Sequence, residues 1–129
     1  MLSIEISSPV YPSEDLDKVR TAILRIFPDA VIDGTDTGLS ASSESIDTFS
    51  KKIRKQKILD TTRSVLIRGQ RGNVTRFFLN KQVAFVGKIS FCEERTILGT
   101  IKVVMESDDM DGLIDRVSPV TVDGEEVIL

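Results

Sequence analysis

Residues 2–28 read LSIEISSPVYPSEDLDKVRTAILRIFP and contain the signals of a strand followed by a helix. Apolar and polar side chains alternate from Leu2 to Ser7, which is the period of a half-buried strand. Apolar side chains then recur at helical spacing, at Leu16, Val19, Ile23 and Ile26. Ser13 stands where a helix N-cap belongs, and Pro28 ends the helix because proline supplies no N–H. The stretch therefore predicts a domain that combines strands with helices.

The next forty residues favour a short strand, a polar loop and a broken helix. Residues 30–33 are apolar enough for a strand, and residues 34–43 are predicted as a turn or loop. Residues 44–67 have helical periodicity, but their apolar stripe moves to the opposite face partway along. We expect a break near Arg54 to Lys57, with one continuous helix between two apolar surfaces as the alternative.

Three strands and a helix are predicted in the remainder of the chain. The glycines of residues 68–73 indicate a loop, and residues 74–79, 83–91 and 97–105 follow as strands joined by hairpin-length connections. A last helix is predicted from a cap at Asp108 to Val117. The order is β-α-β-α(α)-β-β-β-α, which predicts a single α+β domain over residues 1–129. We expect a mixed sheet with helices mainly on one face.

Composition excludes several classes of function. The 129 residues include no histidine and one cysteine, so the chain offers no Ser-His-Asp triad, Cys-His dyad or Cys/His metal cluster. Cys92 is interpreted as a half-buried, small apolar side chain. No apolar run reaches the roughly 20 residues of a membrane helix, and the first residues lack the pattern of a signal peptide. The sequence thus predicts a cytoplasmic protein without a cofactor.

Charge is distributed unevenly along the chain. The formal charge of the whole sequence is −3, but residues 1–50 carry −6, residues 51–81 carry +9 and residues 82–129 carry −6. Lysine and arginine bind phosphate backbones through charge and counterion release. The candidate nucleic-acid-binding residues are therefore Lys51, Lys52, Arg54, Lys55, Lys57, Arg63, Arg68, Arg71, Arg76 and Lys81. The alternative is an ordinary solvated helix face, since most of these charges oppose the apolar stripe of Ile46, Phe49 and Ile53.

Two further clusters are weaker candidates. One is a group of three carboxylates that could bind a divalent metal: Asp108, Asp109 and Asp111. Calcium loops, however, need further ligands at defined spacing. Helix capping explains the carboxylates without a metal. The glycines around Arg71 match neither a Walker loop nor a dinucleotide fingerprint. We therefore expect no metal site and no catalytic residues.

Several segments, in order along the chain, resemble a known family. They are Val10–Asp15, Ile26–Ala30, Gln56–Asp60, Phe78–Lys88, Leu98–Ile101 and Pro119–Thr121. The sequence is similar to archaeal proteins described as RNA-binding or as predicted exosome subunits with a fold like double-stranded-RNA-binding domains. The resemblance implies a three-layer α+β fold like that of ribosomal protein L-five, and a homodimer. It also marks Asn80, Lys81 and Gln82 as a family signature, although a tight turn would equally use asparagine there.

Two main hypotheses follow. The first is a non-enzymatic, RNA-associated protein that holds the phosphates of structured RNA with residues 51–81 and selects by shape. The second is a dimeric protein-interaction module that pairs through a strand edge or docks its basic segment on an acidic protein partner. An enzyme that uses lysine or carboxylates is a third, less favoured hypothesis.

Overall fold

The computed structural model of the chain describes residues 1–93, 99–122 and 125–126. Its helices are α1 (Leu16–Ile26), α2 (Asp47–Lys55), α3 (Leu59–Arg68), α4 (Lys81–Phe85) and α5 (Met110–Val117). Its strands are β1 (Leu2–Pro9), β2 (Val31–Thr35), β3 (Gly38–Ser43), β4 (Val74–Leu79), β5 (Phe91–Cys92), β6 (Ile101–Ser107), β7 (Thr121–Val122) and β8 (Glu125–Glu126). The chain is an α+β protein, as the sequence predicts.

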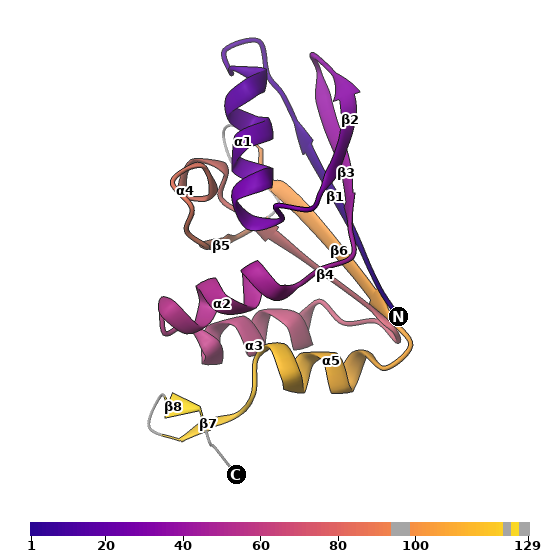
Figure 1. Cartoon of the computed structure of the whole chain (residues 1–129), viewed down its shortest axis with the longest axis vertical. Helices are drawn as coiled ribbons and strands as arrows, with labels where there is room; N and C mark the ends of the chain where they lie inside the picture. The colour runs from indigo at the N-terminus through magenta and orange to yellow at the C-terminus, as the bar shows by residue number, and fades with distance from the viewer. Residues whose placement is uncertain (94–98, 123–124, 127–129) are drawn as a thin grey trace.

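The main sheet has the strand order β2-β3-β1-β6-β4-β5 (Figure 1). In the centre of this sheet, Ile4 of β1 lies opposite Ser43 of β3 on one side and Met105 of β6 on the other. The prediction of a mixed sheet is wrong, because the pairings among the described strands are all antiparallel. β1 and β2 do run in the same direction, but β3 lies between them.

β3 falls in the segment that was expected to be a loop. Leu39, Ala41 and Ser43 are buried, and Ser40 and Ser42 between them are exposed. The strand therefore has the two-residue period of a half-buried strand, but its apolar signal consists of only two side chains. β2 and β3 form a hairpin in which Val31 pairs with Ser42.

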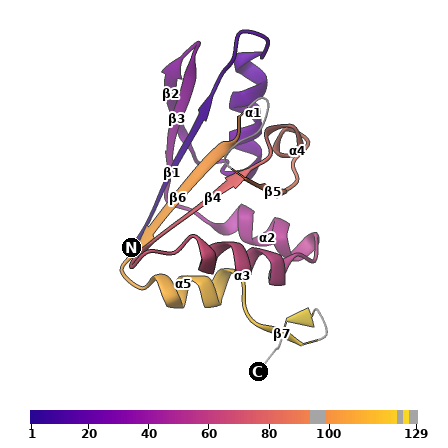
Figure 2. The same cartoon turned by 180° about the vertical axis from the view of Figure 1, so that it is seen from behind.

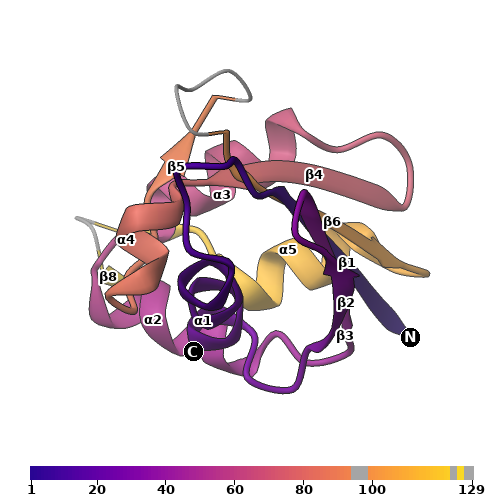
Figure 3. The ribbon, with the colours of Figure 1, turned by 90° about the horizontal axis from the view of Figure 1, so that it is seen from above.

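The helices gather on one face of the sheet, which curves around them (Figure 3). In β1, Ile4 and Ile6 point into the core and are at most 1% exposed, whereas Glu5 and Ser7 point away from the helices and are exposed. The prediction of helices mainly on one face is confirmed. Within the described residues the fold therefore has two layers, rather than the three that the resemblance implies.

Four phenylalanines join the helical layer to the sheet. The ring centroid of Phe49, in α2, lies 6.2 Å from that of Phe27, 5.6 Å from that of Phe77 and 6.4 Å from that of Phe91. Such pairs prefer the offset or edge-to-face arrangements seen here for Phe91, whose ring stands at 69° to Phe49. Phe49 is completely buried at the centre of this cluster.

The predicted break in the second helical region is confirmed. α2 ends at Lys55 and α3 begins at Leu59, and Lys57 between them has a φ of 59°. This left-handed conformation turns the chain so that α3 runs beneath β4, as Figure 2 shows from behind. The turn lets Ile53 and Leu66, which lie on different helical faces by sequence, both reach the core.

α4 occupies the region predicted as the second of three consecutive strands. Asn80 caps this helix, because its side-chain oxygen accepts a hydrogen bond of 3.0 Å from the N–H of Val83. The alternation of Val83, Phe85, Ile89 and Phe91 predicts a strand, but of this region only Phe91–Cys92 forms one. The expected hairpin at Asn80 to Gln82 is thus wrong. The predicted position Ile97 lies outside the described residues.

Helix caps differ by one or two positions from the prediction. Asp15 rather than Ser13 caps α1, by accepting a hydrogen bond of 2.9 Å from the N–H of Asp17. Asp109 rather than Asp108 caps α5, through the N–H of Gly112 at 3.0 Å. The described helices include none that is long and apolar enough to cross a membrane.

Candidate nucleic-acid interface

The structure divides the ten predicted phosphate-binding residues among several locations. One of them is in the interior, three contact backbone carbonyls of neighbouring elements, three are exposed on and just after α2, and three lie around a hollow of the sheet. A single continuous basic surface is therefore not formed by residues 51–81.

Lys81 is the residue in the interior. Its side chain is 7% exposed, and its ammonium lies 3.0 Å from a carboxylate oxygen of Glu14, which is 11% exposed. The ammonium also donates a 2.6 Å hydrogen bond to the carbonyl of Pro9 and lies 5.3 Å from the ring centre of Tyr11. Lys81 thus joins α4 to the segment between β1 and α1, and the prediction that it contacts phosphate is replaced by a structural role.

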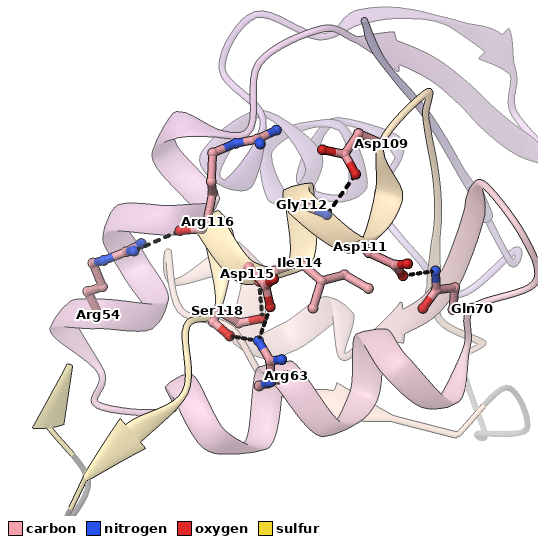
Figure 4. A network of polar contacts seen from close by, with 10 residues as sticks. All are labelled: Arg54, Arg63, Gln70, Asp109, Asp111, Gly112, Ile114, Asp115, Arg116 and Ser118. Atoms are coloured by element: carbon pink, nitrogen blue, oxygen red, sulfur yellow. Dashed lines mark hydrogen bonds and ion pairs between the residues drawn. The ribbon is translucent and has the colours of Figure 1, made fainter. Parts of the chain in front are cut away.

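Arg54 and Arg63 hold the carboxyl end of α5 (Figure 4). Arg54 donates hydrogen bonds to the carbonyls of Val117 (3.2 Å) and Arg116 (3.0 Å). Arg63 donates to the carbonyl of Ser118 at 3.1 Å and forms an ion pair of 2.8 Å with Asp115. Cations at a helix C-terminus satisfy its free carbonyls and favour its dipole. These two arginines therefore serve the packing of α2, α3 and α5.

Of the other lysines on and just after α2, one donates a hydrogen bond to a backbone carbonyl and three are exposed. Lys52 donates a 2.6 Å hydrogen bond to the carbonyl of Gly87, which follows α4. Lys51, Lys55 and Lys57 are exposed. Beneath them Phe49 and Ile53 are fully buried, as predicted, and Ile46 is half-buried.

A basic hollow lies where the end of α3 meets β4, and it extends onto the sheet surface that faces away from the helices. The hollow has a volume of about 750 Å³, and its charged lining residues are Arg68, Arg71, Arg76, Lys102 and Glu93. Val74, Phe78 and Val104 form much of its apolar floor. Four cations thus face one carboxylate among the described lining residues. We call this region the basic hollow.

Local backbone geometry brings the arginines of the basic hollow together. α3 ends at Arg68, and a Cβ on the next residue, Gly69, would overlap the carbonyl of Arg76 in β4. Only glycine lets the helix end approach the strand so closely. The chain then reverses at Gly72, whose φ is 64°, and Arg71 and Val74 exchange hydrogen bonds of 2.7 and 3.2 Å. This turn returns the chain to the hollow within a few residues.

Lys102 is a residue of the hollow that the charge count along the sequence missed. It lies between the buried Ile101 and Val103 in β6 and pairs with Phe78 of β4. The signal was present, because alternation along a strand places Lys102 on the face opposite its buried neighbours. Cys92, on the other side of Phe78, is half-buried as predicted, and burial raises the pKa of its thiol.

The three signature residues have separate structural surroundings. Asn80 caps α4 and Lys81 binds Glu14, whereas Gln82 is exposed; Lys81 and Gln82 both line a hollow of about 300 Å³ between α1 and α4. Asn80 has a φ of −71° and caps a helix, so the tight turn is wrong, and a functional role for Asn80 stays a prediction. Of the three, only Lys81 and Gln82 line this hollow.

The aspartates before and within α5 are also accounted for by structure. Asp109 caps the helix, and Asp111 accepts a 2.8 Å hydrogen bond from Gln70 (Figure 4). Asp108 lies 3.6 Å from the amino terminus. Among the described residues there is no group of three or more side chains of the kinds that hold a metal ion. Capping therefore explains Asp109, whereas Asp108 and Asp111 have other partners.

A family model described as RNA binding matches residues 3–107, which include the whole basic hollow. The chain belongs to this RNA-binding family. A UPF0201 protein of Sulfurisphaera tokodaii is 41% identical over 133 residues, which cover 96% of this chain and 92% of that protein. The resemblance found in the sequence is thereby confirmed.

Further members of the RNA-binding family and their structures agree with this assignment. A UPF0200/UPF0201 protein of Archaeoglobus fulgidus is 40% identical over 98% of this chain, which spans only 40% of that longer protein. The crystal structure of a UPF0201 protein from Methanococcus jannaschii has a TM-score of 0.90 at 32% identity and covers 98% of this chain and 99% of that one. The fold described above is therefore the fold of this family.

Proposed function

We propose that the chain is a non-enzymatic protein that binds structured RNA through the basic hollow. The observation that carries the proposal is that Arg68, Arg71, Arg76 and Lys102 line one hollow, with Glu93 as the opposing charge among its described lining residues. The match of the family model over residues 3–107 supports RNA as the ligand. Cationic and apolar side chains line the hollow, a combination suited to holding phosphates and sugars.

Phosphate contacts would supply most of the affinity and little base specificity. Guanidinium groups form bidentate contacts with phosphate, and Arg68 and Arg76 are exposed for such contacts. Residues 1–50 and 82–129 each carry −6, which repels polyanions elsewhere on the molecule. We infer modest affinity that is directed to one surface.

The proposal is tested by two variants that remove the same number of positive charges. Replacing Arg68, Arg71 and Arg76 by glutamine is expected to weaken binding of a folded RNA hairpin by about 10- to 100-fold at low salt, because three phosphate contacts are lost. Replacing Lys51, Lys55 and Lys57 by glutamine changes the net charge equally but leaves the basic hollow intact. The second variant is expected to change the affinity by less than about threefold. Fluorescence anisotropy with a labelled hairpin measures both.

Equal losses of RNA affinity in the two variants would mean that the affinity depends only on the net charge of the protein. This result would contradict the proposed site. Loss in the α2 variant alone would move the interface to α2. Circular dichroism and thermal unfolding of each variant show whether the fold is retained.

A second candidate function is a homodimeric interaction module. β2 is an edge strand of the sheet, and Val31 on this strand is 72% exposed. Exposed strand edges pair readily with a second chain. We expect a dimer in sedimentation experiments at tens of micromolar, whereas a monomer over that range would count against this candidate. This second candidate function also includes the binding of an acidic protein partner by Lys51, Lys55 and Lys57.

A further inference from the structure

A second hollow adjoins the basic hollow on the same face of the sheet. It has a volume of about 440 Å³ and is lined mainly by small and polar residues of β1, of β3 and of the segment just before β6, such as Ser7, Gly38 and Thr100. Phe78 and Lys102 line both hollows. The side chain of Phe78 therefore stands at the boundary between two depressions of the open sheet face.

Phe78 differs from the other aromatic residues of the sheet in its direction. Alternation along β4 buries Thr75, Phe77 and Leu79 in the core, so Phe78 points to the opposite side. It is half-buried there, with Lys102 as its cross-strand neighbour in β6. An aromatic ring at such a position could simply cover Cys92, its neighbour in β5. However, that role would not require cations on both flanks.

Cations flank the ring at distances that suit one nucleotide. Arg76 lies two residues before Phe78 on the same strand face, which is about 6.6–6.8 Å along the strand. Lys102 lies directly opposite Phe78, at a Cβ separation of about 5 Å. A base on the ring would thus have its own phosphate and the adjacent phosphate within reach of these two side chains.

We propose that Phe78 is a stacking platform for an unpaired base of the bound RNA, with Arg76 and Lys102 holding the flanking phosphates. This inference rests on the proposed function and specifies its ligand as a single-stranded segment, free or within a folded RNA. A base inside an A-form duplex is stacked on its neighbours and cannot present its face to a protein ring. Stacking on aromatic side chains tolerates any base, because every base has a π-face.

The second hollow determines where the bound RNA segment continues beyond Phe78. From Phe78 this hollow extends to Tyr11, which is 40% exposed and whose ring is held over Lys81. Between Phe78 and Tyr11 the hollow is lined by the small side chain of Ser7 and by Gly38, which has no side chain, so a sugar-phosphate backbone can lie there. The bound segment therefore runs from the basic hollow across the ring of Phe78 toward Tyr11.

The test is a conservative change at Phe78. Phe78→Leu keeps an apolar side chain and removes the ring, and it is expected to weaken binding of a single-stranded RNA by about tenfold while leaving the salt dependence unchanged. Phe78→Tyr retains the ring and is expected to bind within about twofold of the unmodified protein. The unmodified protein is expected to quench 2-aminopurine in the single strand, and Phe78→Leu is expected to lose this quenching. A blunt duplex of equal length should bind more weakly than the single strand.

The outcomes separate this inference from the proposed function. If Phe78→Leu binds and quenches like the unmodified protein while the Arg68, Arg71 and Arg76 variant loses affinity, Phe78 is no platform, but the basic hollow remains the RNA site. Tighter binding of the duplex than of the single strand would also overturn the inference. If the unmodified protein binds neither RNA, the proposed function itself fails.

Discussion

Replacing Lys81 by methionine is expected to lower the free energy of unfolding by about 3–5 kcal/mol. The change removes the cation that lies 3.0 Å from Glu14 and donates to the carbonyl of Pro9. Both charged side chains are nearly buried, at 7% and 11% exposure, so the carboxylate of Glu14 would be left without its cation in a poorly hydrated place. Urea denaturation followed by circular dichroism measures the change.

Two controls define the role of the Lys81–Glu14 pair. Lys88→Met makes the same chemical change at an exposed lysine and is expected to alter stability by no more than about 0.5 kcal/mol. The double variant Lys81→Met, Glu14→Leu replaces both charges by apolar side chains and is expected to recover most of the loss. A loss below about 1 kcal/mol in Lys81→Met would contradict the structural role assigned to this residue.

Replacing Phe49 by alanine is expected to lower the free energy of unfolding by about 3–5 kcal/mol. Phe49 is fully buried, and its ring contacts those of Phe27, Phe77 and Phe91. Its removal leaves a cavity between α2 and the sheet and eliminates the aromatic contacts as well. Chemical denaturation again provides the measurement.

Ile67→Ala is the matched control for Phe49, since it shortens an apolar helical side chain that is 49% exposed. We expect it to change stability by about 0.5 kcal/mol or less. Comparable losses in the two variants would show that the aromatic cluster does not contribute as the packing indicates.

The parts of the fold that could be predicted from the sequence are those with a long, regular pattern. β1 and α1 are examples, because Leu2 to Ser7 alternates strictly and the stripe from Leu16 to Ile26 has helical spacing. The break between α2 and α3 was also predictable, because the apolar residues change face near Arg54 to Lys57.

The errors arose where a short pattern was ambiguous. Leu39 and Ala41 are too few to distinguish a strand from a serine-rich loop. Val83 and Phe85 fit a strand by alternation, yet Asn80 supplies a helix cap that decides the local conformation. Antiparallel pairing of β1 with β3 depends on contacts 29 or more residues apart, such as Pro9 with Gly38 and Ile6 with Ala41, which no local pattern contains.

The candidate site was predicted only in part, because charge along a sequence does not specify direction in space. Arg54 and Arg63 belong to the +9 segment, but their partners are carbonyls of α5, more than fifty residues away. Lys102 lies outside that segment and joins Arg76 only because β6 pairs with β4. Three arginines of the predicted set remain at the hollow.

The salt dependence of RNA binding by the unmodified protein tests the central claim most directly. We assume that four side chains neutralise phosphates, namely Arg68, Arg71, Arg76 and Lys102. A plot of the logarithm of the association constant against the logarithm of the salt concentration should then be linear, with a slope of about −3 to −4. This slope reflects roughly one released counterion for each of the four contacts. A slope near zero, or no binding of RNA at low ionic strength, would contradict the assignment of the basic hollow as an RNA interface.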